Sequence, residues 1–333
     1  MKNILLAFLC FFAIQIVATA QDTFSIVAVD ITTGEVGSAG ASCLDNSAIA
    51  GGAVIISDII PGRGAIHTQS YWLAANQANA HQKMLEGLSP EEIIDWLENN
   101  DVQNQPGRRQ YGVVDFDEAG NSRSAAFTGV NCLDWKGHHT GVNYSIQGNI
   151  LLGQMIIDSI EARFLRTQGS LADKLMSALQ GANVVGADTR CAPEGVSSLS
   201  AFLRVAQPDD DADSLYLDLN VPETPYGVEP IDELQLLYDE WLNWVGQQEK
   251  EVEETLFEVF PNPAQQWINF RHTMRSDESL VVEFRDLQGK LLKTVSAKTS
   301  NGRINVKSIK PGLYLVNLKQ GNRVLASRKI YRH

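Results

Sequence analysis

The sequence predicts a mixed α+β domain with stacked sheets covered by helices, followed by a small all-β module. Pairs of strands alternate with pairs of amphipathic helices over residues 23–245, and this alternation favours sheets packed together with helices outside them. Short strands separated by Gly and Asn turns fill residues 257–333, as is typical of a small β-sandwich. This last segment carries 14 Lys and Arg against 5 Asp and Glu, whereas the rest of the chain carries 13 against 35. We therefore expect two units with different roles.

The composition of the whole chain excludes several classes of protein. The chain has 333 residues, of which 44% are hydrophobic and 20% charged, so wholesale disorder is excluded. Its net charge of −13 argues against a nucleic-acid partner, because phosphate groups would be repelled.

The first twenty residues have the pattern of an export signal. Lys2 precedes an apolar run over residues 4–17, and Ala18 and Ala20 are the small residues that signal peptidase requires. The run is too short for a comfortable membrane span, so an uncleaved anchor helix is the weaker alternative. We expect residues 1–20 to be removed as a signal peptide, a mature chain that begins at Gln21, and no stable membrane span.

A strand hairpin opens the large domain, which we place at residues 21–246. The alternating run 23–30 predicts a strand, and a turn at residues 32–34 leads to a second strand, 35–42. Ser89, followed by Pro90 and Glu92, predicts a helix start with a capping box. Further strands are predicted at 53–56, 64–70, 110–115, 122–128, 144–147, 196–206 and 214–220, and further helices at 74–86, 154–166, 171–180 and 231–245.

A charged segment separates the two units. Residues 249–254 read Glu-Lys-Glu-Val-Glu-Glu and have little to bury, so we expect a charged linker at 247–256. In the small module, 257–333, strands are predicted near Ile268 and at 280–286, 290–295, 302–306 and 314–319.

Three cysteines follow the signal peptide, namely Cys43, Cys132 and Cys191. In an oxidising compartment one disulfide and one thiol are expected, and three pairings are open. Three buried thiols are the other alternative. Their spacing is not that of a zinc site.

The small module resembles the type A sorting domain of the type IX secretion system of Bacteroidota. The resemblance rests on Val259–Pro263, Asp286–Lys290 and Pro311–Val316, which occur in the order and at the spacing of that module. It implies that the secretion machinery is a partner, that the protein crosses the periplasm and outer membrane, and that this domain is then removed. The product is secreted or attached to the cell surface. A binding sandwich with a basic face is the alternative.

Residues 23 to about 245 resemble the DUF1028 family, which is placed among the N-terminal-nucleophile (Ntn) hydrolase-like folds. The residues that carry the resemblance are Thr23–Ala28, Gly40–Ser42, His67–Ser70, Gln147–Leu151, Ala187–Arg190 and Glu229–Leu234. The resemblance implies a four-layer αββα sandwich and hydrolysis of amide bonds without a cofactor.

Thr23 is the nucleophile that this resemblance implies. In Ntn chemistry the α-amine of the first residue, with a pKa near 8, takes the proton from that residue's own hydroxyl. Cleavage after Ala20 leaves Gln21 and Asp22 ahead of Thr23, so a second trimming step is required before its amine is free. The alternative is that Thr23 is only a β-branched strand residue.

Six other residues are candidates for the site. Asn149 follows Gly148 and is expected to donate to an oxyanion, the alternative being a turn residue. The other five are expected to bind substrate, although a structural salt bridge or a structural histidine are alternatives for three of them. They are Ser42, His67, Gln69, Asp188 and Arg190.

The predicted function is hydrolysis of a linear or cyclic amide, or of a small peptide, by an exported protein. The alternative is a non-catalytic surface protein that keeps the fold and uses its groove for binding. Relatives have a basic residue after the position of Ser42, where this chain has Cys43, and that departure puts catalysis in doubt. We expect no cofactor and no metal, because His138–His139 and Asp209–Asp213 lack the spacing of known metal sites.

Overall fold

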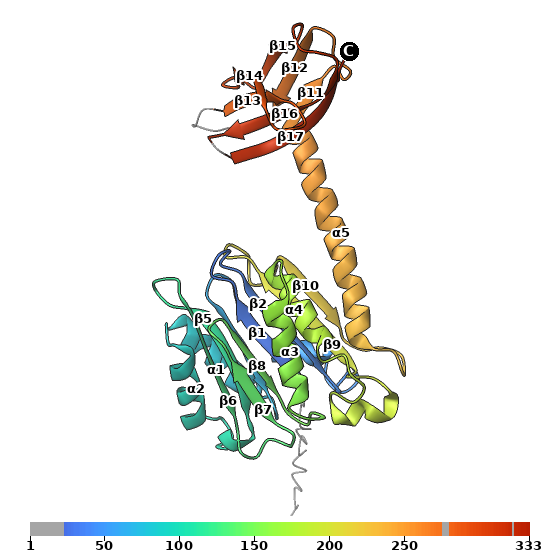
Figure 1. Ribbon diagram of the computed structural model, residues 1–333. Helices are drawn as coiled ribbons and strands as arrows, with labels where there is room; N and C mark the ends of the chain where they lie inside the picture. The colour runs from blue at the N-terminus through green and yellow to red at the C-terminus, as the bar shows by residue number, and fades with distance from the viewer. Residues whose placement is uncertain (1–22, 275–279, 322) are drawn as a thin grey trace, which may run out of the picture. The chain divides into compact units, whose positions relative to one another are not determined.

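The computed structural model describes residues 23–274, 280–321 and 323–333, and for residues 246–255 it describes the backbone alone (Figure 1). The chain forms two compact units, one ending at Tyr238 and one beginning at Asp239, so the division falls within helix α5 (Pro230–Leu256). The expected signal peptide, its cleavage site and Gln21 lie outside the described residues.

The first unit is a mixed α/β structure with two antiparallel sheets. The larger sheet has six strands in the order β10-β9-β2-β1-β8-β7. The smaller has four strands in the order β3-β4-β5-β6. Their bounds are β1 Thr23–Val29, β2 Val36–Ser42, β3 Ser57–Ile60, β4 Gly64–Gln69, β5 Gln110–Phe116, β6 Ser122–Thr128, β7 Gly137–Thr140, β8 Tyr144–Gly148, β9 Ser200–Ala206 and β10 Leu217–Val221.

The register of β1 determines what lies beside Thr23. Strand β1 pairs with β2 from Thr23↔Ser42 to Val29↔Val36, and on its other side it pairs with β8. The last pair with β8 is Phe24↔Gly148, and the backbone N–H of Asn149 then donates to the carbonyl of Thr23 at 3.3 Å. The start of β1 therefore lies between the end of β2 and the residue that follows β8.

Each sheet carries a pair of helices on one face, and the two sheets meet through their other faces (Figure 1). Helices α1 and α2 pack on the four-stranded sheet, and α3 and α4 on the six-stranded sheet. Gly37 permits close approach of α4, because a Cβ at this position would lie 2.4 Å from the side chain of Leu175. Their bounds are α1 Ala74–Leu85, α2 Pro90–Asn99, α3 Met155–Arg166 and α4 Leu171–Gln180.

Local sequence accounts for the starts of two of these helices. Ser89 accepts a hydrogen bond from the backbone of Glu92, whose side chain accepts one from the backbone of Ser89, and this is the expected capping box. Ser170 and Asp173 form a second capping box at the start of α4. Each box satisfies backbone N–H groups that the first turn of a helix leaves without partners.

The space between the two sheets changes from polar to apolar along β1. Alternation places Thr23, Ser25, Val27 and Val29 on the same face of the strand. The hydroxyl of Ser25 donates to a side chain of the opposite sheet, so this face is the one between the sheets. Val27 and Val29 belong to an apolar cluster that includes residues of both sheets. Thr23 therefore lies at the polar end of the space between the sheets.

The second unit contains a C-terminal all-β region of two sheets, in the orders β11-β12-β15 and β14-β13-β16-β17. The hydrophobic core of this region includes Phe257, Phe270 and Phe284. Two strands of this region, β11 and β17, were not predicted. The bounds are β11 Phe257–Phe260, β12 Trp267–His272, β13 Leu280–Arg285, β14 Leu291–Ser296, β15 Asn301–Asn305, β16 Gly312–Gln320 and β17 Arg323–Arg332.

The structure differs from the sequence prediction at several elements, of which β3 is a strand that was not predicted. Residues 53–56 were expected as a strand but lie in a 3-10 helix, η1 (Gly52–Ile56), because Gly51 and Gly52 turn the chain with φ of 87° and 65°. His138 and His139, for which no strand was predicted, lie on edge strand β7. The helix expected at 231–245 continues as α5 through residues 247–256, since Glu, Gln and Lys are strong helix formers.

Candidate functional site

Thr23 lies at the start of β1, and its side chain is almost completely buried. Its Oγ1 has no hydrogen-bond partner within the described residues. Its carbonyl oxygen, by contrast, accepts hydrogen bonds from the backbone of Asn149 and from Nε2 of Gln69 at 3.1 Å. A buried hydroxyl without a partner costs free energy, and such a group calls for a physical explanation, of which a catalytic role is one.

A network of carboxamide side chains surrounds this position. Oε1 of Gln110 accepts from Nε2 of Gln69 at 2.8 Å and from Nδ2 of Asn149 at 3.0 Å. Oδ1 of Asn149 is buried and, like Oγ1 of Thr23, meets no partner in the described part of the chain. The structure thus brings the expected site residues Thr23, Gln69 and Asn149 together through Gln110, which was not predicted.

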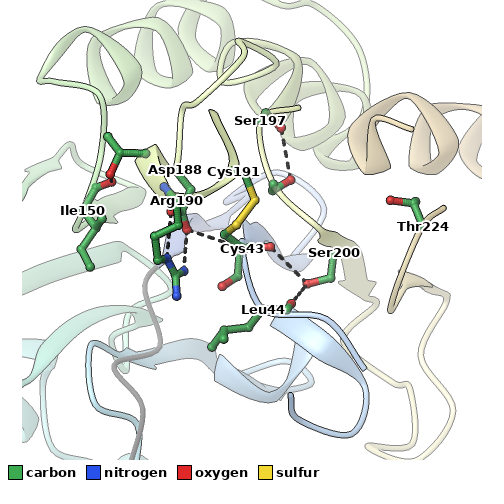
Figure 2. Close-up of a disulfide and its surroundings, with 12 residues drawn as sticks. Cys43, Leu44, Ile150, Asp188, Arg190, Cys191, Ser197, Ser200 and Thr224 are labelled. Atoms are coloured by element: carbon green, nitrogen blue, oxygen red, sulfur yellow. Dashed lines mark hydrogen bonds and ion pairs between the residues drawn. A yellow bond between two sulfur atoms is a disulfide. The ribbon is translucent and has the colours of Figure 1, made fainter. Parts of the chain in front are cut away.

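Ser42 faces Thr23 across the β1–β2 pair and is also buried. The next residue, Cys43, forms a disulfide with Cys191, which is one of the three pairings that the sequence left open (Figure 2). Cys132 is a buried thiol and donates to the backbone carbonyl of Arg109. The disulfide ties the end of β2 to η3 (Thr189–Glu194), 148 residues away in the sequence.

Asp188 and Arg190 lie beside this disulfide (Figure 2). The buried carboxylate of Asp188 accepts from Nε of Arg190 at 3.0 Å and from Nη2 at 2.7 Å, which is the two-point geometry that arginine favours. It also accepts from the backbone N–H of Cys43 at 3.0 Å and caps η3. The pair therefore holds the η3 segment against the end of β2, next to Ser42.

The same segment reaches the strand end that carries Asn149. The backbone N–H of Thr189 donates to the carbonyl of Ile150 at 3.0 Å, and Leu151 forms an isolated bridge with Asp188. Ile150 has a positive φ of 56°, which is uncommon for a β-branched residue and stores strain directly after Asn149. The end of β2, the residues that follow β8 and the η3 segment therefore meet at the start of β1, although they lie far apart in the sequence.

His67 lies elsewhere in the space between the sheets and is completely buried. Its Nδ1 accepts from Nε2 of Gln147 at 3.1 Å, and its Nε2–H donates to the hydroxyl of Ser38 at 2.6 Å. Burial, with a smaller contribution from the charge of Arg204, lowers the pKa of His67 to about 3, so the ring is neutral. Its partners are those of a structural histidine, and none of them is Thr23.

Gly112 makes room for this part of the network. A Cβ at Gly112 would lie 1.9 Å from Oε1 of Gln147, whose amide also bonds Ser25 and Ser145. The glycine on β5 is therefore required for Gln147 to lie between the sheets. An inward-facing Gln110, two residues before a glycine on a buried strand, is the sequence signal that could have identified this network.

A buried ion pair that was not predicted lies at the start of β5. Nε of Arg109 donates to Asp101 at 2.7 Å, and both side chains are almost completely buried. Burial raises the pKa of Asp101, but hydrogen bonds from Arg109, Gln105 and Asn76 outweigh it and lower the pKa to about 2.

This ion pair also supports the turn that follows β4. Arg109 donates to the carbonyl of Tyr71, and both Ser70 and Tyr71 have positive φ angles, of 55° and 59°. Such angles are strained for residues other than glycine, so the turn needs support from its surroundings. Arg109 thereby helps to place Gln69 on one side and Gln110 on the other.

The side chains around Thr23 determine which chemical groups the site can bind. Among the described residues no group of three or more His, Cys, Asp or Glu side chains is placed to hold a metal ion. The side chains around Thr23 are hydroxyls and carboxamides, which donate and accept hydrogen bonds but carry no charge at neutral pH. Such a site is suited to an uncharged polar group, with the hydroxyls of Thr23 and Ser42 at paired strand ends.

The fold resembles that of a solved structure, a DUF1028 protein of Silicibacter pomeroyi. The two have a TM-score of 0.53 and 23% identity over 67% of this chain and 93% of that chain, which shows the fold alone. Domains 3 and 4 of rat CD4 match with a TM-score of 0.19 and 9% identity over 67% of this chain and 76% of that one, too low to bear on the fold. No curated protein matches the chain.

Residues 258–332 match the secretion system C-terminal sorting domain. This confirms the expected module and its handling by the type IX secretion machinery, and it indicates export to the cell surface or the medium. No helix within the described ranges has the length and apolar character needed to cross a membrane.

Residues 23–234 match DUF1028, a family of unknown function. The match begins at Thr23, where β1 begins, and it includes both sheets, their helices and every residue of the candidate site. Because it covers more than half of the sequence, the chain belongs to the DUF1028 family.

Proposed function

We propose that the chain is an exported hydrolase of amide bonds with the four-layer αββα sandwich of the Ntn hydrolases. Thr23 carries this proposal, because its buried Oγ1 has no partner in the described structure and lies at a strand end between two sheets. Two sheets that meet face to face, each with a helix pair outside, support the sandwich. The substrate would be a linear or cyclic amide or a small peptide, and the catalytic unit residues 21–246.

The reaction would proceed through a covalent ester. Oγ1 of Thr23 attacks the substrate carbonyl carbon, and its proton passes to the free α-amine of Thr23. The α-amine then gives this proton to the leaving nitrogen as the C–N bond breaks, which releases an amine and leaves an acyl ester on Thr23. Water attacks the ester while the α-amine accepts a proton from it, and the resulting ammonium gives this proton to Oγ1 as the ester C–O bond breaks. This step releases the carboxylic acid and restores the hydroxyl and the free amine.

This reaction requires that Gln21 and Asp22 be removed, because otherwise the nitrogen of Thr23 is an amide and cannot act as a base. N-terminal sequencing of the secreted protein tests the requirement directly. A chain that begins at Thr23 supports the proposal. A chain that begins at Gln21 or pyroglutamate excludes the mechanism.

Variants of Thr23 provide the second test. With a panel of amides, Thr23→Ala should abolish turnover, whereas Thr23→Ser should retain part of it because the hydroxyl is kept. Thr68→Val is a matched control, since Thr68 also has a buried hydroxyl with no partner in the described structure. It lies on the face of β4 opposite to that of Gln69, and therefore away from Thr23. Full turnover by Thr23→Ala would place the nucleophile elsewhere.

One observation favours the second candidate, a non-catalytic binding protein with this fold. Cys43 stands where the family resemblance implies a basic residue, and it is committed to a disulfide. Arg190, which lies beside this disulfide, is paired with Asp188. No cation therefore remains at this position to lower the pKa of an amine. Retention of amide binding without turnover by a chain that begins at Thr23 would support this candidate.

A further inference from the structure

The orientation of the Gln110 amide follows from its partners. Its Nε2 donates to the carbonyl oxygens of Gly148 at 2.8 Å and Gly137 at 3.1 Å, and to the hydroxyl of Thr128 at 2.9 Å. A carbonyl oxygen only accepts hydrogen bonds, so the atom that faces these two carbonyls is the nitrogen. The other terminal atom of Gln110 is therefore the oxygen.

This orientation determines the orientation of Asn149 in turn. Oε1 of Gln110 only accepts, so the atom of Asn149 that lies 3.0 Å from it is the nitrogen Nδ2. The remaining atom, Oδ1, is a carbonyl oxygen that is buried and has no donor in the described structure. Gln69 differs, because its Oε1 accepts from the hydroxyl of Ser25 at 2.6 Å.

Asn149 therefore presents an acceptor beside Thr23. The backbone N–H of Asn149 bonds the carbonyl of Thr23, whose own Oγ1 is likewise buried and has no partner in the described chain. An unpaired buried carbonyl is costly, and a ligand that brings an N–H would satisfy it. An oxyanion, in contrast, would be repelled by the lone pairs of Oδ1.

We infer that Oδ1 of Asn149 accepts a hydrogen bond from the N–H of the substrate amide, and that Gln110 is a positioning residue that holds Asn149 in this orientation. The inference rests on the proposed function and narrows its substrates to primary and secondary amides, which carry an N–H on the scissile bond. Esters and tertiary amides, which lack that N–H, are selected against. Asn149 is thus an acceptor, rather than the oxyanion donor that the sequence led us to expect.

Binding of two small probes tests this inference without requiring turnover. N-methylacetamide and methyl acetate have nearly the same shape, but the ester has an oxygen in place of the N–H. The full secreted chain, uniformly labelled with ¹⁵N so that backbone and side-chain amides both give signals, is titrated with each probe by NMR. The side-chain signal of Asn149 should report binding of the amide about tenfold tighter than the ester. Equal affinity, or no binding of the amide, would overturn the inference.

Three variants distinguish the effect of the Asn149 acceptor from effects of nearby residues. In Asn149→Leu, which has no Asn149 signal, backbone amide signals report binding instead. Asn149→Leu keeps the approximate shape but removes the acceptor, so the preference for the amide should disappear. Gln110→Met frees Asn149 to rotate and should reduce the preference. Thr68→Val is the control and should leave it unchanged. A preference that survives in Asn149→Leu, with the disulfide and thermal unfolding intact, would also contradict the inference.

The titration also distinguishes this inference from the proposed mechanism. Thr23→Val has no nucleophile, yet it retains the acceptor and should still prefer the amide. A chain that begins at Gln21 but prefers N-methylacetamide would exclude the Ntn mechanism and leave the role of Asn149 intact. Turnover that depends on Thr23, without a preference for the amide probe, would support the Ntn mechanism and exclude the proposed role of Asn149.

Discussion

Asn149 lies directly across from Thr23, and its backbone N–H donates to the carbonyl of Thr23 at 3.3 Å. Each of the two side chains carries one buried polar atom that meets no partner within the described residues. Globular proteins contain few such atoms, and the occurrence of two of them at one strand end supports the proposal that substrate binds here. The same atoms make the site costly for stability, which can be measured.

Replacing Thr23 with valine should leave the protein at least as stable as before. Valine has almost the shape of threonine but removes the buried hydroxyl, so we expect the free energy of unfolding to stay constant or to rise by about 1 kcal/mol. Urea unfolding of Thr23→Val and of the wild type would measure the difference. A loss of stability of about 1 kcal/mol or more would indicate that the hydroxyl has a stabilising partner.

Loss of the Cys43–Cys191 disulfide should destabilise the first unit strongly. The bond closes a loop with a sequence separation of 148 residues, and removal of a native disulfide typically costs about 2–5 kcal/mol, with long loops at the upper end. The double variant Cys43→Ser/Cys191→Ser should therefore unfold at lower urea concentration than the oxidised wild type. Dithiothreitol should shift the wild type towards the variant and leave the variant unchanged. Equal sensitivity of both proteins to dithiothreitol would contradict the assignment.

Removal of one partner from the buried pair of Asp101 and Arg109 should be more costly than removal of a surface pair. Asp101→Asn leaves a buried guanidinium without its carboxylate, which costs about 3–5 kcal/mol. Glu86→Gln, which breaks the surface pair with Lys83, is the matched control and should change stability little. Urea unfolding at neutral pH measures both variants, and similar values for the two would contradict this account.

The same pair makes stability depend on pH in the acid range. Because the folded-state pKa of Asp101 is lowered to about 2, its stabilisation is present above the unfolded-state value near 3.8 and is lost as the pH falls through the folded value. Stability of the wild type should therefore fall more steeply between pH 4 and 2 than that of Asp101→Asn, measured by thermal unfolding. Parallel pH profiles would show that Asp101 has an ordinary pKa in the folded state.

His67 should make stability fall as the solution becomes acidic. Its folded-state pKa is about 3, below the unfolded value of 6.5, so the unfolded chain binds a proton between these values and the folded chain does not. The free energy of unfolding should therefore fall with decreasing pH below about 6.5, by up to about 1.4 kcal/mol per pH unit. His67→Gln should reduce this slope between pH 6.5 and 5. An unchanged slope would show that another group is responsible.

Much of the local structure could be predicted because the signals for it are local. The β1–β2 hairpin follows from alternating residues and a short turn, and the Ser89 cap follows from residues three positions apart. Elements whose signal is weak or ambiguous were missed or misassigned. The polar edge strand at His138–His139 resembles a loop in composition, and the apolar run at 53–56 could be a strand or a 3-10 turn.

Most of the candidate residues were identified from the family motif, but their arrangement was not. The sequence indicated Thr23, Asn149, Gln69 and Asp188, while Gln110 gave no motif of its own. His67 shares a strand face with Gln69 and was grouped with it, but it bonds Ser38 and Gln147 farther along the space between the sheets. A position on a strand face does not specify the distance from the strand end at which the site forms.

The sequence by itself determined that this protein is exported, that it carries a sorting module, and that Thr23 opens the first strand of a DUF1028 domain. Only the tertiary structure decided that Cys43 pairs with Cys191 and that Gln110 orients Asn149. The physical reason is one of range. Motifs and caps depend on residues a few positions apart. Gln110 and Asn149 are 39 positions apart and meet because two sheets pack together, whereas Cys43 and Cys191 are 148 positions apart and meet because η3 packs against the end of β2.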